Sequence, residues 1–263
     1  MHPFAELTVP AGSVGIHWFE QNAYALKDPR GTTIQIDPYY THVRPAQRFI
    51  RPQPPLDESE LPTDYVLVTH AHRDHTSSET IARIHQAWPE ARYIGPQDSI
   101  EKILQQTDVD KGHTVLISAG ESVALGDVTI HASYSKPPVG DPEANIPPPS
   151  TVHLGYVIEM ESIKVYVSGD AINTFANHGE LIDPVAALEP DIGFLTTHPT
   201  EGEFPTFEGS VLMAQKLGLK TAVPSHYACF VARTYDPHEW AALFPADGPR
   251  PLIIPWNSHI IYP

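Results

Sequence analysis

Residues 66–78 read VLVTHAHRDHTSS, in which a run of aliphatic and β-branched residues is followed by a cluster of potential metal ligands. Such an apolar run is typical of a buried strand. The cluster consists of His70, His72, Asp74 and His75. Imidazole and carboxylate groups are good ligands for zinc, manganese and iron, and the end of a strand fixes their directions. The segment therefore predicts a strand that carries a metal site at its end.

The order of these residues, His-x-His-x-Asp-His, leaves room for two ions. In an extended loop, His70 and His72 can face one ion while Asp74 and His75 face another. The structural alternative is a polar loop whose histidines only cap the following helix. That helix is predicted over 77–88, because Thr76 and Glu79 have the spacing of a capping box.

Length, charge and cysteine content narrow the function classes. The chain has 263 residues, of which 41% are hydrophobic, enough for one large domain with a substantial core. Its formal net charge of -16 argues against a nucleic-acid partner, which would be repelled. A small anionic substrate, held by a few local cations and metal ions, stays compatible with this charge. Cys229 is the only cysteine, so an internal disulfide framework and thiolate-rich zinc sites are excluded.

The sequence also bears on location. The amino-terminal residues, MHPFAELTVPAGSVG, lack the basic start and apolar core of a signal peptide. No apolar run reaches the length of a membrane span, and the acidic charge argues against an anionic membrane surface. We therefore expect a cytoplasmic protein with no membrane partner. Assembly with further copies of the chain is left open.

Apolar periodicity and turn residues divide the chain into many short strands and fewer helices. Prolines gather at 45–62 and 137–149, and both stretches are predicted as long ordered loops, because proline cannot donate to a sheet. Strand-rich meanders come early in each half and β–α alternation comes late. This order predicts a single α/β (α+β) domain, 1–263, built as a four-layer αββα sandwich rather than a doubly wound sheet.

The predicted elements are as follows. Strands are expected at 14–19, 22–26, 32–36, 64–69, 91–95, 113–118, 122–125, 127–132, 152–159, 163–168, 191–196 and 221–224, with two more at the end of the chain. Helices are expected at 77–88, 97–106, 207–217 and 237–243, with a further helical region after Asp170.

With this motif the chain resembles the metallo-β-lactamase superfamily, whose two-metal centre is built on His-x-His-x-Asp-His. QIDP at 35–38 is similar to the family's early aspartate motif and gives Asp37 a supporting role. VYVSGDA at 165–171 resembles the strand that delivers a metal-bridging aspartate, Asp170, and VPSHY at 223–227 supplies the late histidine, His226. Within the superfamily, WFEQNAY, IDPYY, SGDA and SHYACF most resemble the ascorbate-6-phosphate lactonase-like hydrolases.

The resemblance implies a hydrolase with two divalent metal ions, zinc or manganese, although iron suits the same ligands. A water shared by two ions about 3.5–4 Å apart would lose a proton and attack the substrate as hydroxide. Asp74 would be the catalytic residue that orients this hydroxide and handles its proton. The implied ligands are His70, His72 and His153 for one ion, Asp74, His75 and His226 for the other, and Asp170 as the bridge.

One ligand of this set is ambiguous, because His131 and His153 both compete for it. The segments 152–159 and 163–168 are predicted to form a hairpin that turns near 161–162. Its pairing puts position 153 opposite Asp170, and cross-strand neighbours lie about 4.5–5.5 Å apart at Cβ. We therefore favour His153. A slip of one residue would turn His153 to the opposite face of the sheet.

Four further residues are candidates for substrate binding, and each has a structural alternative. His198 follows a predicted buried strand and either faces the site or is a satisfied structural group. Tyr227 either contacts substrate or is a packed aromatic residue. Arg44 and Arg48 either clamp an anionic group from the first proline-rich loop or belong to a solvated basic patch.

The predicted function is hydrolysis of a small ester-type substrate, a lactone or a phosphoester, and by resemblance a sugar-acid phosphate lactone. The same centre can serve a phosphodiesterase or a nuclease, since the fold does not select the substrate, but the acidic charge makes RNA the poorest choice. A non-catalytic metal-binding protein is the remaining hypothesis.

Overall fold

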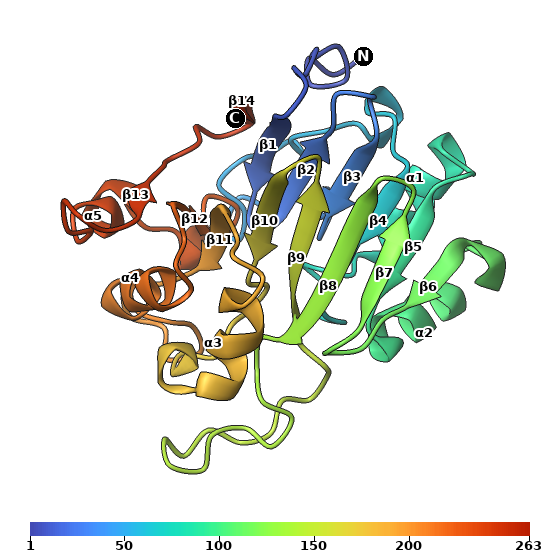
Figure 1. The fold of residues 1–263 in the computed structure, drawn as a ribbon. Coiled ribbons are helices and arrows are strands. Elements are labelled where there is room, and N and C mark those ends of the chain that lie inside the picture. Colours follow the sequence, from blue (N-terminus) through green and yellow to red (C-terminus); the bar gives the residue numbers. More distant parts are fainter. The chain divides into compact units, whose positions relative to one another are not determined.

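The computed structural model describes residues 1–263, which form two compact units. Unit 1 comprises Met1–Ile117, Tyr227–Thr234 and Ile254–Pro263, and unit 2 comprises Ser118–His226 and Tyr235–Ile253. Each unit contains one seven-stranded sheet with its own helices (Figure 1).

The sheet of unit 1 has the strand order β14-β1-β2-β3-β4-β5-β6. Its first half is antiparallel, from β14 to β3, and its second half is parallel, from β3 to β6. The strands are β1 (Val14–Glu20), β2 (Ala23–Lys27), β3 (Thr33–Ile36), β4 (Tyr65–Leu67), β5 (Arg92–Gly95), β6 (Thr114–Leu116) and β14 (Ser258–Tyr262).

The helices of unit 1 are α1 (Ser78–Ala87) and α2 (Gln97–Gln106), with the short 3-10 helices η1 (Glu58–Glu60), η2 (Lys111–His113) and η4 (Val231–Arg233). Both α-helices bury an apolar stripe with the spacing of one helix face. Ile81 and Ile84 of α1 and Ile103 of α2 pack with Val66 and Tyr93 of the parallel strands. This packing fixes the segment between β4 and α1, where the histidine cluster lies.

The start of α1 differs in one detail from the prediction. Ser77 is the N-cap, and its hydroxyl accepts a hydrogen bond from the Thr80 amide. The predicted capping box of Thr76 and Glu79 is wrong, because the Thr76 hydroxyl donates to the His70 carbonyl at 2.7 Å instead. The hydroxyl next to the expected one therefore caps the helix, and Thr76 ties down the ligand loop.

The sheet of unit 2 repeats the plan of unit 1, with the order β13-β12-β11-β10-β9-β8-β7. The pairs from β7 to β10 are antiparallel and those from β10 to β13 are parallel. The strands are β7 (Ser122–Leu125), β8 (Val128–Tyr134), β9 (Leu154–Met160), β10 (Ile163–Val167), β11 (Ile192–Thr196), β12 (Thr221–Ser225) and β13 (Arg250–Pro251).

The helices of unit 2 are α3 (Gly179–Ala186), α4 (Phe207–Lys216) and α5 (Pro237–Ala241), preceded by the 3-10 helix η3 (Phe175–Asn177). Val185 of α3, Met213 of α4 and Trp240 of α5 are buried in one cluster with Tyr166 and Leu195 of the sheet. The indole nitrogen of Trp240 donates to the Ser210 hydroxyl at 2.7 Å, so its polar group is satisfied within this core.

These elements confirm the predicted α/β class with two sheets and helices. The helical region expected after Asp170 is η3 followed by α3. No helix combines the length and the apolar character needed to span a bilayer. The description of 1–263 as a single domain stays a prediction.

Candidate metal centre

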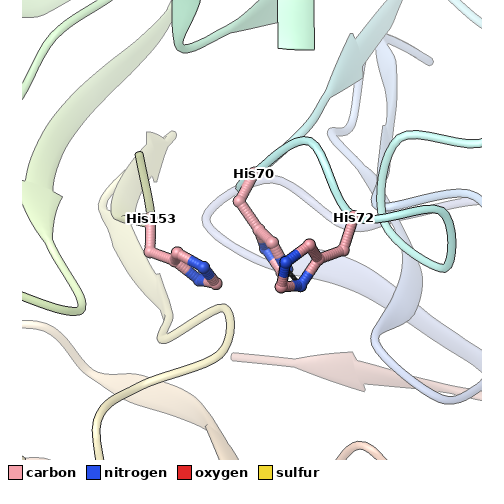
Figure 2. A group of neighbouring side chains, drawn as sticks. All are labelled: His70, His72 and His153. Carbon is pink, nitrogen blue, oxygen red and sulfur yellow. Dashed lines mark hydrogen bonds between the residues drawn. The ribbon is translucent and has the colours of Figure 1, made fainter. Parts of the chain in front are cut away.

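The loop between β4 and α1 brings the four residues of the motif together within unit 1. The His70 Nε2 and His72 Nδ1 atoms lie 3.0 Å apart, and the two rings meet edge to face (Figure 2). The His70 and His75 rings are 4.0 Å apart between centroids, and His75 Nε2 lies 3.8 Å from Asp74 Oδ2. His70 and His75 are buried, whereas His72 and Asp74 are half-buried. The loop thus presents several ligand atoms over a short distance.

Asp37 anchors this loop, as the resemblance implied. Its carboxylate is buried and accepts hydrogen bonds of 2.7 Å from the Thr69 amide, the Thr69 hydroxyl, the Asn22 amide and His75 Nδ1. Asp37 also has a positive φ of 43°, a strained conformation that the surrounding bonds hold in place. Because Nδ1 of His75 donates to a carboxylate, its Nε2 atom is left as the ligand atom, an arrangement common for metal-binding histidines.

Two other side chains hold the backbone of the ligand loop. The Thr76 hydroxyl donates to the His70 carbonyl, and Lys102 of α2 donates to the Ala71 carbonyl at 2.7 Å. Partial burial lowers the pKa of Lys102. Both contacts fall between neighbouring ligand positions, so they limit the freedom of the loop where the ligands are attached.

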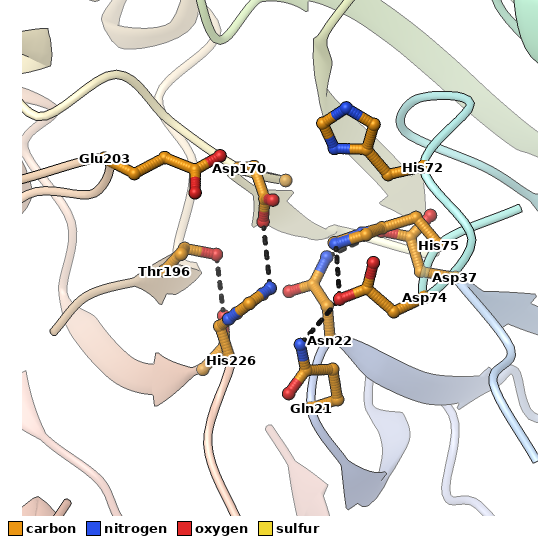
Figure 3. A network of polar contacts seen from close by, with 12 residues as sticks. Gln21, Asn22, Asp37, His72, Asp74, His75, Asp170, Thr196, Glu203 and His226 are labelled. Atoms are coloured by element: carbon orange, nitrogen blue, oxygen red, sulfur yellow. Dashed lines mark hydrogen bonds and ion pairs between the residues drawn. The ribbon is translucent and has the colours of Figure 1, made fainter. Parts of the chain in front are cut away.

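Gln21 and Asn22 were not predicted as site residues. They form the turn between β1 and β2, where Gln21 has a φ of 55°. The Gln21 amide donates to Asp74 Oδ2 at 2.9 Å (Figure 3), and the Asn22 amide donates to Asp37. The available signal was the segment WFEQNAY, in which two adjacent amides interrupt two apolar strands.

In unit 2, the predicted ligands Asp170 and His226 follow the carboxyl ends of β10 and β12. These strands belong to the parallel half of the sheet, with β11 between them, so the residues that follow them emerge at one edge. The His226 Nε2 and Asp170 Oδ1 atoms lie 3.4 Å apart (Figure 3). His226 has a φ of 68°, another strained position at this edge.

The hairpin predicted for unit 2 is present with the predicted register. Met160 pairs with Ile163 and Tyr156 pairs with Val167, so β9 and β10 turn at Glu161–Ser162. Continuing this register by three residues places position 153 opposite position 170. His153 is buried and directly precedes β9 (Figure 2).

The competing residue, His131, lies in the middle of β8. Its Nδ1 atom is 2.7 Å from the Ser122 hydroxyl and its Nε2 atom is 3.9 Å from Glu159. It is half-buried and engaged by its strand neighbours. The assignment of His153 as the ligand, rather than His131, stays a prediction.

His198 and Tyr227 are both buried and engaged locally. The His198 Nδ1 atom accepts hydrogen bonds from the amides of Thr200 and Glu201 at 3.3 and 3.0 Å. Tyr227 stacks on Trp18 with 4.6 Å between ring centroids, and burial raises the pKa of its phenol. These contacts match the structural alternative for each residue, and their part in substrate binding stays a prediction.

The two predicted arginines differ sharply. The Arg44 side chain is fully buried and its guanidinium lies 2.6 Å from the Glu20 carboxylate. The prediction that Arg44 clamps substrate is therefore corrected, because Arg44 forms a structural ion pair with Glu20. This partner lies 24 positions earlier and could not be identified from the sequence. Arg48 is exposed and lines a pocket together with Asp74.

Comparison with known protein families identifies the superfamily of this chain. The family described as Beta-lactamase superfamily domain matches residues 32–227, well over half of the chain. The chain belongs to the β-lactamase superfamily. The matched residues of this superfamily member include every predicted metal ligand.

Relatives and solved structures agree with that membership. A UPF0173 metal-dependent hydrolase of Archaeoglobus fulgidus is 26% identical over 239 residues, covering 89% of this chain and 91% of the relative. Igni18, a metallo hydrolase from Ignicoccus hospitalis, superposes with a TM-score of 0.70 at 19% identity, covering 95% of this chain and 99% of that chain. An isothiocyanate hydrolase from Delia radicum gut bacteria has a TM-score of 0.70 at 17% identity, with 94% and 98% covered.

These similarities confirm the predicted metallo-β-lactamase-like fold of this superfamily member. At 19% and 17% sequence identity, the two solved structures support the fold alone. The finer resemblance to ascorbate-6-phosphate lactonase-like hydrolases is not confirmed.

Proposed function

We propose that this protein is a metal-dependent hydrolase with a dinuclear centre, acting on a small anionic lactone or phosphoester. The observation that carries the proposal is the buried 2.7 Å contact between Asp37 and His75 Nδ1, within a loop of four ligand-type side chains. The structural alternative, in which the histidines cap α1, is disfavoured because Ser77 caps that helix. Membership of the superfamily and the names of the relatives support the same hydrolytic function.

The proposed ligands are those that the sequence indicated. We assign His70, His72 and His153 to one ion, Asp74, His75 and His226 to the other, and Asp170 to both. The side chains present fit such ions, since imidazole and carboxylate donors suit zinc, manganese and iron. The Asp37 carboxylate, by fixing the His75 ring, supplies the outer support that metal-binding histidines ordinarily have.

When bound in this centre, divalent ions would supply a water of lowered pKa and a Lewis acid for the attacked carbonyl or phosphoryl group. The chain supplies the orientation and the proton transfer. Gln21 donates to Asp74 Oδ2 and fixes the plane of that carboxylate. We therefore assign to Asp74 the task of orienting the attacking water and accepting its proton.

The net charge and the pocket beside Asp74 support the proposed substrate class. With a net charge of -16, the chain repels nucleic acid, so a small molecule is favoured over RNA or DNA. The exposed Arg48 in the Asp74 pocket supplies a local positive charge for an anionic group. A phosphodiesterase acting on small substrates is the nearest alternative within the same chemistry.

The test is turnover by metal-free protein reconstituted separately with zinc, manganese or iron. Lactones, phosphomonoesters and phosphodiesters would be assayed in parallel, and we expect metal-dependent hydrolysis of a lactone or a phosphoester. Asp74→Asn should lower kcat by about a hundredfold or more, because it removes the proton acceptor. Asp108→Asn, at an exposed position of the same unit, is the matched control and should keep wild-type turnover. Wild-type turnover in Asp74→Asn would remove the basis for the proposal.

A further inference from the structure

A pocket of about 400 Å³ lies within unit 1, beside Asp74. This volume is sufficient for a small-molecule ligand. The residues that line it come from two separate segments and from the ligand loop: Gln47, Arg48, Asp74, Phe230, Ala232 and Arg233. The pocket is thus lined both by a proposed metal ligand, Asp74, and by two arginines, Arg48 and Arg233.

The backbone brings these arginines to one place. Phe49 and Phe230 form an antiparallel bridge, and the Val231 amide donates to the Arg48 carbonyl at 2.9 Å. The 3-10 helix η4 follows immediately and ends at Arg233. The position of Arg48 and Arg233 around one pocket is therefore built into the pairing of two segments far apart in the sequence.

Arg48 is held on an aromatic surface with its charge exposed. Its guanidinium carbon lies 5.1 Å from the centre of the Phe230 ring and 5.7 Å from that of Phe49. Its side chain is exposed, in a chain with 32 acidic residues against 16 basic ones. Stacking on an aromatic ring limits the motion of the side chain and leaves the planar donor edge available for an oxyanion.

The neighbouring arginines show what a structural role looks like in this loop. Arg44 is buried against Glu20, and Arg51 donates to the Ala228 carbonyl at 2.6 Å while its guanidinium lies over the Trp256 ring. Both therefore have partners inside unit 1. Arg48 differs from them in facing a pocket that contains Asp74.

We propose that Arg48 and Arg233 recognise an acidic group of the substrate, a phosphate or a carboxylate, and so select anionic over neutral esters. This inference rests on the proposed hydrolase function and names the part of the substrate that is not cleaved. Arginine is suited to the task, because its fork of donors binds a phosphate or a carboxylate through two hydrogen bonds. Phe230, under the Arg48 guanidinium, forms the apolar wall of the same pocket.

The kinetic test uses three lactones that differ in charge: glucono-δ-lactone, its phosphate ester and glucarolactone, which bears a carboxylate. On the metal-loaded enzyme, Arg48→Gln and Arg233→Gln should each raise KM for a charged lactone by about ten- to hundredfold, with kcat little changed. The neutral lactone should show no such effect. The charged lactone whose KM rises more in the variants identifies the group, phosphate or carboxylate, that the pocket binds. Equal effects on the neutral and charged lactones would overturn the proposal.

A binding measurement separates this inference from the proposed function. Calorimetry on the metal-free chain, with phosphogluconate and glucarate as probes, should show binding of one of them that is lost in Arg48→Gln. Arg48→Lys, which keeps the charge but not the two-donor geometry, should bind with intermediate affinity. Arg92→Gln removes an exposed charge elsewhere in unit 1 and should bind as wild type does.

The outcomes are distinct. Loss of binding in the pocket variants, without turnover of any lactone by the wild type, would keep the recognition site and reject the proposed reaction. Turnover of lactones with unchanged KM and unchanged binding in both pocket variants would keep the reaction and reject the recognition site.

Discussion

Asp37 shows most clearly how one residue organises the candidate site. Its two carboxylate oxygens accept four hydrogen bonds, which come from Asn22, Thr69 and His75. All four partners are donors, so a neutral amide cannot replace the carboxylate without placing its own NH₂ group against a donor. The role of Asp37 is therefore to orient His75, and its loss should act on metal binding before it acts on the reaction.

For Asp37→Asn we expect zinc affinity to fall by about ten- to hundredfold, the usual effect of removing the carboxylate behind a ligand histidine. Competition with a chelator of known affinity measures it. Asp108→Asn, at an exposed position of the same unit, should be indistinguishable from wild type. Unchanged zinc affinity in Asp37→Asn would show that the loop does not hold a metal through His75.

The ambiguous histidine gives a paired prediction. Freshly purified wild-type protein should contain close to two transition-metal ions per chain by elemental analysis. His153→Ala should lose one of them under mild chelation, because a ligand imidazole is removed. His131→Ala should retain both, since that ring is engaged by Ser122 of the neighbouring strand β7. An ion lost from His131→Ala and kept in His153→Ala would reverse the assignment.

At the scale of single residues, the sequence indicated the residues to which we assign the chemistry more readily than the side chains and backbone groups that contact them. The motif showed His70 and His75, and the resemblance singled out Asp37. Lys102 could not be found, because its contact with Ala71 joins positions 31 residues apart through the packing of α2. The burial of Arg44 could not be predicted for the same reason, since Arg44 lies in a loop and its partner Glu20 lies at the end of strand β1.

At the scale of elements, helix α1 depends on a hydroxyl that the sequence could not single out. Thr76 and Ser77 are adjacent and both are good cap residues. Which of them caps the helix depends on a tertiary contact, namely the bond from Thr76 to the His70 carbonyl. Periodicity and turn residues gave the observed bounds of α2 and β7, 97–106 and 122–125, whereas the strand predicted at 64–69 is shorter in the structure, Tyr65–Leu67.

Removal of the Ser77 hydroxyl and removal of the Thr76 hydroxyl should have different effects on stability and on metal affinity. Ser77→Ala should lower the free energy of unfolding by about 1 kcal/mol, the usual value of an N-cap, with metal affinity nearly unchanged. Chemical denaturation of the metal-free protein measures the first quantity and chelator competition the second. Thr76→Val, the comparison variant, should weaken metal binding because it frees the His70 carbonyl. The opposite pattern in the two variants would restore the capping box of Thr76 and Glu79.

At the scale of the whole molecule, stability should depend on pH through a buried histidine. Burial lowers the pKa of His17 to about 3, and the nearby His2 and His259 act in the same direction. Burial also lowers the pKa of His2. In the unfolded chain, His17 titrates near 6.5. Between these two values the unfolded state binds more protons than the folded state, so stability falls as the pH falls from about 6.5 toward 3.

The expected slope for this one histidine is up to about 1.4 kcal/mol per pH unit. Free energies of unfolding measured across that range should therefore fall more steeply in the wild type than in His17→Gln, which cannot take up the proton. Carboxylates contribute equally to both curves, so the difference isolates His17. Parallel curves would show that His17 does not couple folding to protons.

The general plan of the molecule was predictable because its pattern is regular. Strands come first and β–α alternation follows in each half, and each sheet indeed passes from antiparallel to parallel pairing. The sequence could not show that the residues of unit 1 are discontinuous, because that depends on segments 227–234 and 254–263 folding back.

This discontinuity has a consequence for synthesis on the ribosome. Strand β1 is among the earliest strands to be made, but β14, which pairs with it along Val14 to Trp18, is translated after every other strand. Until residue 262 leaves the exit tunnel, β1 is the open edge of its sheet, and an open apolar edge invites pairing with other chains. A chain interrupted before residue 258 lacks β14 and leaves this side of β1 unpaired, so we expect it to aggregate rather than to form the native sheet of unit 1.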